Sequence, residues 1–471
     1  MLMKQKSILF LYITISFFVV LAGFIFQSSF NAMTYLTIIQ LLTIIISIKF
    51  TKKLMSVGTI FIILLYIFHC SQAIITTFGF NDPYFHRSVI ARSRDNEFIR
   101  AELYVLISMA FWGLFYLSTI INRKINDMDN RYSYDLVDKV YLDRLFSIAL
   151  AIFLVSFIPL LYSDIQKIQA LKSNGYMDTY TTYREGYGKY ISLIGKFARP
   201  AITLMILGLC YKPQKARIIL LFSTIYFGIM MLSGDRGTNI IYIVTNLFIY
   251  FRFVSMPKFK TIVMAGVVGY FFLGFVSAIS LFRYSDFTLE SLLQVFDLRS
   301  EDGIIYSSLR EFGGTMISLV YSMRFIPEYG GYNCGMSYIA SLLLVFPKLP
   351  QSVVNELGNN FAFTSVFPEA YQDSLGGSVL GEMYYNFGWF GAPLTSIIGV
   401  VIACIDAQID SSEKDSNWVK IAVIVSFIPQ LFLWVRDFFS GILFIGFWMS
   451  VVLYFSFKTN KCQKTGVENS I

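Results

Sequence analysis

The residues of this sequence that could do chemistry are a few charged side chains at the edges of long apolar runs. They are Arg199 before Pro200, Arg236 in the Ser-Gly-Asp-Arg-Gly-Thr segment 233–238, Glu382 at the start of an apolar run, and Arg436 in the Val-Arg-Asp-Phe segment 435–438. Charges at the edge of a membrane span are costly and are functional candidates by default. Guanidinium groups bind phosphate through paired hydrogen bonds, and a carboxylate near lipid has a raised affinity for protons. The combination predicts binding of an anionic ligand and proton transfer.

The composition indicates which elements must position these residues. Of the 471 residues, 56% are hydrophobic and 14% charged, with a mean hydropathy of +0.61, which argues against a water-soluble enzyme, a disordered protein or a coiled coil. A span needs about 17–25 apolar helical residues. We find twelve such runs: 8–26, 33–48, 57–79, 101–121, 145–162, 191–211, 218–232, 238–251, 261–282, 388–405, 418–434 and 440–457. The predicted fold is therefore an all-α polytopic membrane protein.

Cysteine and histidine usage limits the cofactors. Five cysteines without a C-x-x-C pair argue against a disulfide scaffold or a zinc ribbon, and two histidines leave little for a histidine metal centre. We therefore expect no metal and no cofactor. We interpret His69, in the third run, as a packing residue.

Basic residues favour cytoplasmic loops and so orient the spans. They gather at both termini and in the even-numbered connections, which predicts that both termini are cytoplasmic. The net charge of +8 is then mostly a topological signal and implies no nucleic acid. By this assignment the four candidate positions all fall at the outer membrane boundary. The glycines around Arg236 permit close backbone approach, and the helix start that follows offers free N–H groups to an anion.

The two faces differ in the type of their basic residues. The outer face carries twelve arginines and five lysines, whereas the inner face carries five arginines and sixteen lysines, which together are the chain's 38 basic residues. Topology alone would not sort the two types, because either one retains a loop. The bias favours an anionic ligand on the outer face. The alternative is that these arginines pair with local acids such as Asp95, Glu97 and Glu185.

A long outer loop, residues 283–376, separates the predicted spans nine and ten and divides the chain. The predicted organisation is spans one to nine in 1–282, this loop, spans ten to twelve in 377–457, and a cytoplasmic tail in 458–471. Loops this long are usually functional. Within it, the spacing of apolar residues predicts an amphipathic helix over 287–296. The apolar segment 337–346 is too short to cross, so it dips into the membrane or packs on the helices; residues 355–377 are typical of a rim over a cavity. Arg310, from this loop, is a further candidate for the outer cluster.

Three segments carry a resemblance to a known family. They are 233–238, the segment Arg-Glu-Phe-Gly-Gly-Thr at 310–315 continuing to Gly-Met-Ser-Tyr at 335–338, and Gly-Glu-Met-Tyr-Tyr-Asn-Phe-Gly at 381–388. With the many spans and one large outer loop before the last of them, the chain resembles the O-antigen (polysaccharide repeat-unit) polymerases of the Wzy type over nearly its whole length.

The resemblance implies an inner-membrane glycosyltransferase with a GT-C-like fold whose active site faces the periplasm. It implies undecaprenyl-pyrophosphate-linked oligosaccharides as substrates, contacts with membrane lipids and a chain-length regulator as a partner. The departing diphosphate needs positive charge, and without clustered outer acids to hold Mg²⁺ the arginines must supply it. We assign this role to Arg199, Arg236, Arg310 and Arg436. Glu382 is our candidate general base, and Tyr384, Tyr385 and Asn386 are candidate sugar-binding residues.

Two other functions remain open at this point. A flippase for lipid-linked oligosaccharides would need charges along a central cavity and usually has two similar halves; this sequence has no internal repeat and its charges gather at one boundary. The second alternative is a related transferase, either an O-antigen ligase or a peptidoglycan polymerase. A ligase has a closely similar plan and is the hardest to exclude.

Overall fold

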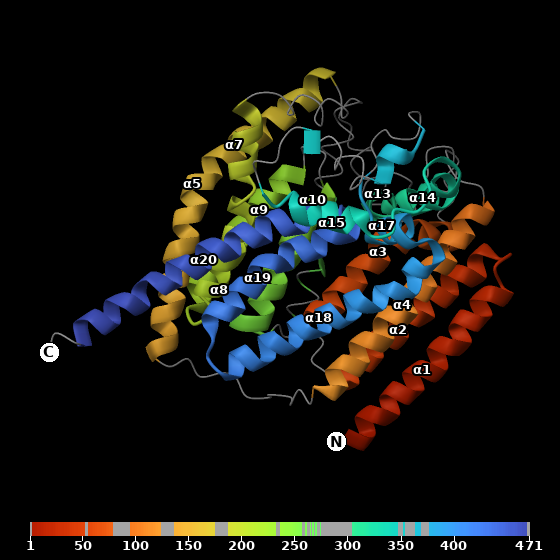
Figure 1. Cartoon of the computed structure of the whole chain (residues 1–471), viewed down its shortest axis with the longest axis horizontal. Coiled ribbons are helices and arrows are strands. Elements are labelled where there is room, and N and C mark those ends of the chain that lie inside the picture. The colour runs from red at the N-terminus through yellow and green to blue at the C-terminus, as the bar shows by residue number, and fades with distance from the viewer. Residues whose placement is uncertain are drawn as a thin grey trace. The chain divides into compact units, whose positions relative to one another are not determined.

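The computed structural model describes most of the chain, and every regular element in the ranges that it describes is a helix (Figure 1). These ranges are 2–51, 55–78, 95–123, 136–174, 187–231, 236–256, 304–346, 352–353, 363–368 and 376–468, with isolated positions between 260 and 274. The prediction of an all-α protein is confirmed for them. The predicted amphipathic helix 287–296 lies outside the described residues.

Within the described ranges, ten helical segments are long and apolar enough to cross a membrane, so the prediction of a multi-pass membrane protein is confirmed. They are Gln5–Ile25, Phe30–Thr51, Val57–Thr77, Asn96–Asn122, Asp138–Gln169, Ile191–Gly208, Arg236–Val254, Val379–Lys414, Trp418–Arg436 and Phe439–Phe457. Each coincides with one of the twelve predicted runs. Of the other two runs, 218–232 falls mainly in a helix that is not among the ten, and 261–282 lies mostly outside the described residues. The total of twelve spans stays a prediction.

The chain forms two compact units that interleave in sequence. Unit 1 comprises Met1–Met128, Val268–Ala407 and Phe432–Gly441, and unit 2 comprises Asp129–Val267, Gln408–Leu431 and Ile442–Ile471. The predicted division at 282, 376 and 457 concerns topology across the membrane and stays a prediction.

The helices of unit 1 come from both ends of the sequence. They are α1 (Leu2–Ile25), α2 (Phe30–Thr51), α3 (Val57–Thr77), α4 (Asp95–Asn122), α13 (Ile304–Phe312), α14 (Thr315–Tyr329), α15 (Met336–Leu343), η5 (Phe363–Val366), α17 (Val379–Phe387), η7 (Gly388–Phe390), the first part of α18 (Gly391–Lys414) and η8 (Trp434–Arg436). The predicted short apolar segment 337–346 is thus largely α15. In this unit α3 packs against α2, α4, α13, α14 and η8.

The helices of unit 2 come mainly from the middle of the chain. They are α5 (Leu136–Asn174), α7 (Tyr187–Gly195), α8 (Ala198–Gly208), α9 (Pro213–Met230), α10 (Arg236–Ile249), the π-helical turn η4 (Tyr250–Val254), the end of α18, most of α19 (Trp418–Leu433) and most of α20 (Phe439–Glu468). In this unit α8 packs along α5 and also contacts α9 and α10.

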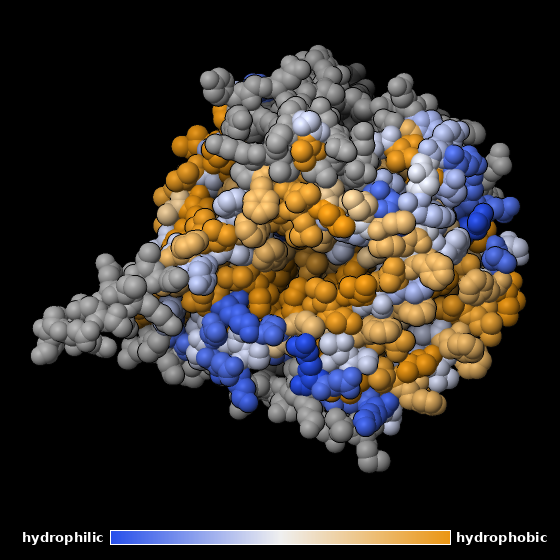
Figure 2. All heavy atoms as spheres, viewed as in Figure 1, coloured by the Kyte–Doolittle hydropathy of each residue, from blue (hydrophilic) through white to orange (hydrophobic). Residues whose placement is uncertain are grey.

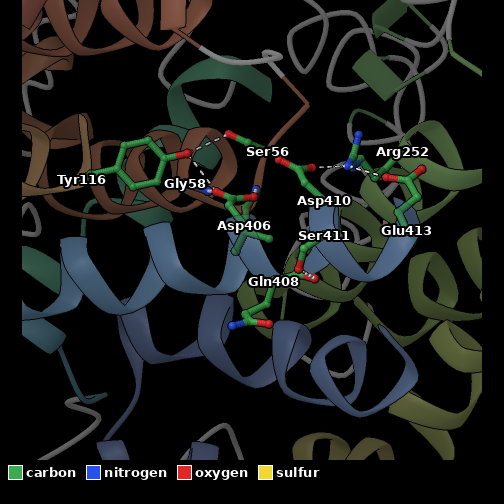
Figure 3. A network of polar contacts seen from close by, with 10 residues as sticks. Ser56, Gly58, Tyr116, Arg252, Asp406, Gln408, Asp410, Ser411 and Glu413 are labelled. Carbon is green, nitrogen blue, oxygen red and sulfur yellow. Dashed lines mark hydrogen bonds and ion pairs between the residues drawn. The ribbon is translucent and has the colours of Figure 1, made fainter. Parts of the chain in front are cut away.

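The central helix of unit 1, α3, is apolar on all sides and mostly buried, as expected of a helix surrounded by others. Its first N–H groups need acceptors, because a helix start leaves them without partners in the helix. Asp406 of α18 supplies them: its Oδ1 accepts from Val57 N at 2.9 Å and its Oδ2 from Gly58 N at 3.1 Å. Tyr116 also donates its hydroxyl to Asp406 Oδ2 at 2.8 Å (Figure 3). This buried cap fixes one end of α3.

The outward faces of several spans are apolar, as a lipid environment requires. On α1, for example, Phe10, Phe17 and Ile25 are all more than 60% exposed. Apolar side chains cover much of the face drawn in Figure 2. These surfaces agree with the assignment of the helices as membrane spans.

Candidate functional site

The Glu382 carboxylate lies fully buried in unit 1, at the first turn of α17. Its Oε1 accepts a hydrogen bond from the Ser337 hydroxyl of α15 at 3.0 Å. Its Oε2 accepts from Trp434 Nε1 at 3.3 Å and from the Phe439 backbone N–H at 3.0 Å. A single carboxylate therefore joins α17 to α15 and to the turn that carries Arg436. Three donors on two oxygens suit the charged form, which only accepts hydrogen bonds.

The Asn386 side chain, one turn further along α17, has bonds on both of its polar atoms. Its Nδ2 donates to Ser337 Oγ and to the Glu382 carbonyl, both at 2.8 Å. Its Oδ1 accepts from the Gly335 N–H at 2.9 Å. The predicted role of Asn386 as a sugar ligand stays a prediction, and it would require at least one of these bonds to be exchanged.

A residue of α3 contacts the start of α17 and helps to fix its position. Ser378 caps the helix, since its Oγ accepts from Gly381 N at 3.1 Å. His69 Nε2 lies 2.8 Å from the same Oγ, and its Nδ1 lies 2.9 Å from the Leu65 carbonyl. The carbonyl can only accept, so Nδ1 carries the proton and the Ser378 hydroxyl donates to Nε2. The interpretation of His69 as a packing residue is confirmed, and it also positions the helix of Glu382.

Arg436 lies in η8, two residues beyond the Trp434 that bonds Glu382. Its guanidinium carbon is 5.5 Å from the centre of the Phe68 ring of α3. A cation over an aromatic face is held without losing its charge to a carboxylate. The turn after it packs tightly against the segment before α17, because a Cβ at Gly377 would lie 2.3 Å from the Asp437 carbonyl carbon. Only glycine fits there.

Arg310, near the end of α13, is brought to the same part of α3. The Gln72 side chain donates to the Arg310 carbonyl at 2.6 Å, and the Phe312 ring meets the Phe68 ring edge-on at 5.5 Å. Phe68 and Gln72 are four residues apart and thus share one face of α3. The exposed guanidinium of Arg310 lies 5.7 Å from the centre of the Tyr306 ring.

One segment of α3, residues 68–72, therefore contacts the elements that carry Arg310, Arg436 and Glu382. These positioning roles were not predicted from the sequence. A signal was present, since His69, Ser71 and Gln72 are polar residues in an otherwise apolar span, where polar side chains need partners. The aromatic Phe68 gave no such signal, because aromatic residues are common in spans.

The other two predicted arginines belong to unit 2. Arg199, in the first turn of α8, forms an ion pair with Asp164 of α5 at 3.7 Å, and its guanidinium lies 5.4 Å from the centre of the Tyr242 ring of α10. Asp164 also accepts a 2.6 Å hydrogen bond from the Tyr226 hydroxyl. Arg236 is the half-buried first residue of α10, six residues before Tyr242, which is about 9 Å along the axis. The convergence of this pair with Arg310 and Arg436 stays a prediction.

Among the described residues of unit 1, Arg324 is an outer arginine that does pair with a local acid. Arg324 forms a two-point ion pair with Glu97, in which Nε donates to Oε1 at 2.9 Å and Nη2 contacts Oε2. For Arg310 and Arg436, the described part of the chain contains no such acid partner. The arginines of the outer set are therefore of two kinds.

The two tyrosines predicted to stack on sugars are buried in aromatic clusters. The Tyr384 ring lies 5.6 Å from that of Tyr104 and 6.0 Å from that of the exposed Tyr332, and the Tyr385 ring lies 6.3 Å from that of Phe363. Tyr338 of α15 stacks on Phe387 beside them.

The arrangement in unit 1 offers positive charge and a carboxylate on connected elements. Arg436 and Glu382 are linked through Trp434 and Phe439, and Arg310 meets the same segment of α3. Arginines of this kind can bind an anion, and a carboxylate can accept a proton.

Comparisons with known proteins point to one family. The O-antigen polysaccharide polymerase Wzy family matches residues 8–461, nearly the whole chain. No curated protein and no solved structure matches the chain.

Proposed function

The chain belongs to the Wzy family of O-antigen polysaccharide polymerases, and from this we propose that it polymerises lipid-linked oligosaccharide repeat units. The growing glycan would pass from its undecaprenyl pyrophosphate carrier to a newly delivered lipid-linked unit. The family match over 8–461 is the observation that carries this proposal. The ten apolar helices support it, because both substrates are membrane lipids.

The reaction breaks one bond and forms one. The bond between the anomeric carbon and the diphosphate oxygen breaks, and the acceptor hydroxyl oxygen bonds to that carbon. The diphosphate leaves with the electron pair, and the hydroxyl proton passes to a base. Catalysis therefore needs positive charge at the leaving group and a carboxylate near the acceptor.

Arginines are our proposed binders of the leaving diphosphate. Arg310 and Arg436 are the first candidates, because they lie over aromatic rings and meet the same segment of α3. Arg199 and Arg236 are the second pair, with the charge of Arg199 partly balanced by Asp164. We expect no metal or cofactor in this role.

Glu382 is our proposed general base. Its Oε1 accepts from a single described donor, the Ser337 hydroxyl, which belongs to the short helix α15. A sugar hydroxyl that replaced Ser337 at this oxygen would lie within hydrogen-bond distance of the carboxylate. Tyr384, Tyr385 and Asn386 on the same helix stay our proposed sugar contacts.

We propose the bacterial inner membrane, with both termini in the cytoplasm, the site facing the periplasm and a GT-C-like arrangement of spans. A chain-length regulator is the proposed protein partner.

Deleting the gene in the host strain tests the function against its two alternatives. A polymerase defect leaves single repeat units attached to the lipid core, because transport and ligation still proceed. A defect in a flippase or a ligase leaves no repeat unit attached. Complementation with the wild-type chain restores the ladder of polymer lengths in the first case. Absence of the single-unit product in the deletion strain would refute the polymerase.

The variant Glu382→Gln tests the proposed base. It keeps the size of the side chain but cannot take the proton, so we expect loss of the polymer ladder at an unchanged protein level. The matched control is Glu328→Gln, which changes an exposed acid at the end of α14. Wild-type ladders from Glu382→Gln would show that another residue is the base.

A further inference from the structure

Helix α15 has its polarity reversed relative to a helix on a water-exposed surface. Its buried residues are small, Ser337, Ala340 and Ser341, and Ser337 bonds Glu382. Its outward face is made of large apolar side chains, which are 43–57% exposed: Met336, Ile339, Leu342, Leu343 and, just beyond the helix, Phe346. A helix surrounded by water would turn these residues inward.

The sequence around α15 carries no charge. From Tyr329 to Pro347 there is no Asp, Glu, Lys or Arg, although the flanking residues are Glu328 and Lys348. The same combination of exposed apolar residues without charge occurs in residues 7–25 of α1, which belong to one of the ten candidate spans. At the position of α15 in Figure 1, the surface in Figure 2 is mostly apolar. The outward face therefore has the composition of a lipid-facing surface.

The turn before α15 is bonded as a dry environment requires. The successive N–H groups of Asn333, Cys334 and Gly335 donate to the Tyr385 carbonyl, the Asn386 carbonyl and Asn386 Oδ1, at 3.0, 3.0 and 2.9 Å. Irregular backbone at membrane depth is tolerated only when the protein satisfies its polar groups. The end of α17 does this for all three donors.

The length of α15 decides how it can enter the membrane. Eight residues span about 12 Å, less than half of a hydrocarbon core of about 30 Å. Two glycines with positive φ, Gly331 at 64° and Gly335 at 86°, lie in the turn before it, and Pro347 follows it in the sequence. A helix of this length could enter the bilayer only if the chain entered and left by the same side.

We propose that α15 is a re-entrant helix whose apolar face lies in the hydrocarbon of the bilayer, while its serine face closes the Glu382 site. The acyl chains of the membrane lipids are its partner. This inference rests on the helix and its turn, and holds whether or not the chain is a polymerase.

Spin labelling of the full chain in lipid vesicles tests this placement. The five native cysteines are replaced, and a nitroxide is attached at Leu342→Cys or, in a second variant, at Ile339→Cys. Collision with oxygen, which concentrates in hydrocarbon, is compared with collision with a water-soluble nickel chelate. Phe17→Cys on α1 is the lipid control, and Asp415→Cys, in the exposed turn after α18, is the water control.

We expect the labels at 339 and 342 to match the Phe17 control, with oxygen accessibility high and nickel accessibility low. Ratios that match the Asp415 control would place the face in water and overturn the proposal. Low accessibility to both reagents would show a protein partner, such as a second copy, and would overturn it as well. A label at Ser341→Cys, on the buried face, reports whether the fold is retained, since it should be inaccessible to both reagents.

Discussion

Two arginines, Arg252 in unit 2 and Arg436 in unit 1, have different surroundings. In unit 2, Arg252 of η4 lies between two acids of α18, with its Nη2 2.6 Å from Asp410 Oδ1 and 2.8 Å from Glu413 Oε2 (Figure 3). In unit 1, Arg436 lies over the Phe68 ring. Arg252 also contacts a ring, that of Phe253. Both arginines therefore contact a ring, and they differ in that only Arg252 is paired with acids in the described ranges.

The presence or absence of paired acids indicates which arginines are able to bind an anionic substrate. Two carboxylates more than balance Arg252, so its charge serves to hold η4 to α18. A ring face leaves the charge of Arg436 uncompensated by any acid in the described ranges. A basic residue of the second kind is costly near a membrane unless an anion binds to it. We therefore expect Arg252 and its two acids to affect the stability of the protein, and Arg436 to affect its activity.

The largest expected effect is on activity, from Arg436→Lys. Lysine keeps the charge but loses the two-point grip of the guanidinium on phosphate, so we expect polymer formation to fall about 100-fold. The measurement is the rate of ladder formation by purified protein on lipid-linked repeat units, with protein level as a check. The control is Arg324→Lys, which changes another ring-stacked arginine but one already paired with Glu97. Equal losses from both variants would break the distinction between the two kinds of arginine.

The next effect is on stability, from Arg252→Ala. Removing one partner of a mostly buried pair leaves Asp410 and Glu413 facing each other. Because these acids are about one-fifth exposed, we discount the usual loss for a buried pair and expect about 2 kcal/mol. Thermal unfolding in detergent measures it. Activity per folded molecule should stay near wild type, and a selective loss of activity would contradict the structural role.

The spans and several candidate site residues could be predicted from the sequence, whereas the contacts between distant segments could not. Ten of the twelve predicted apolar runs coincide with helices that are long and apolar enough to span a membrane, because a bilayer imposes its thickness on the length of apolar segments. Glu382 stood out as a lone acid at the start of an apolar run, and Arg310 and Arg436 as basic residues assigned to the outer boundary. Glu97 was named as a possible acid partner, but no spacing rule predicts that it pairs with Arg324, which lies more than 200 residues away in the sequence. The anchoring of Glu382 by Ser337, Trp434 and Phe439 likewise depends on packing between distant segments.

A smaller effect on activity is expected from Arg310→Lys. Its guanidinium is exposed, so water and salt screen its charge more than that of the half-buried Arg436. We expect about a tenfold loss, growing as ionic strength is raised because the remaining charge is screened further. The same ladder assay at two salt concentrations measures it. A loss as large as that of Arg436→Lys at both salt concentrations would place the two arginines in equivalent environments.

The smallest effect on polymer formation is expected from Phe68→Leu, which tests whether the aromatic ring positions Arg436. Leucine keeps an apolar side chain on α3 but removes the ring face under Arg436 and the edge-on contact with Phe312. A cation over a ring at a partly exposed site is worth about 0.5–1 kcal/mol, so we expect a two- to fivefold loss of polymer formation. In an Arg436→Lys background the same change should cost less, because the stacked guanidinium is already gone. Fully additive losses in this double-mutant cycle would show that Phe68 supports the site only through packing with Phe312, and that the ring does not position Arg436.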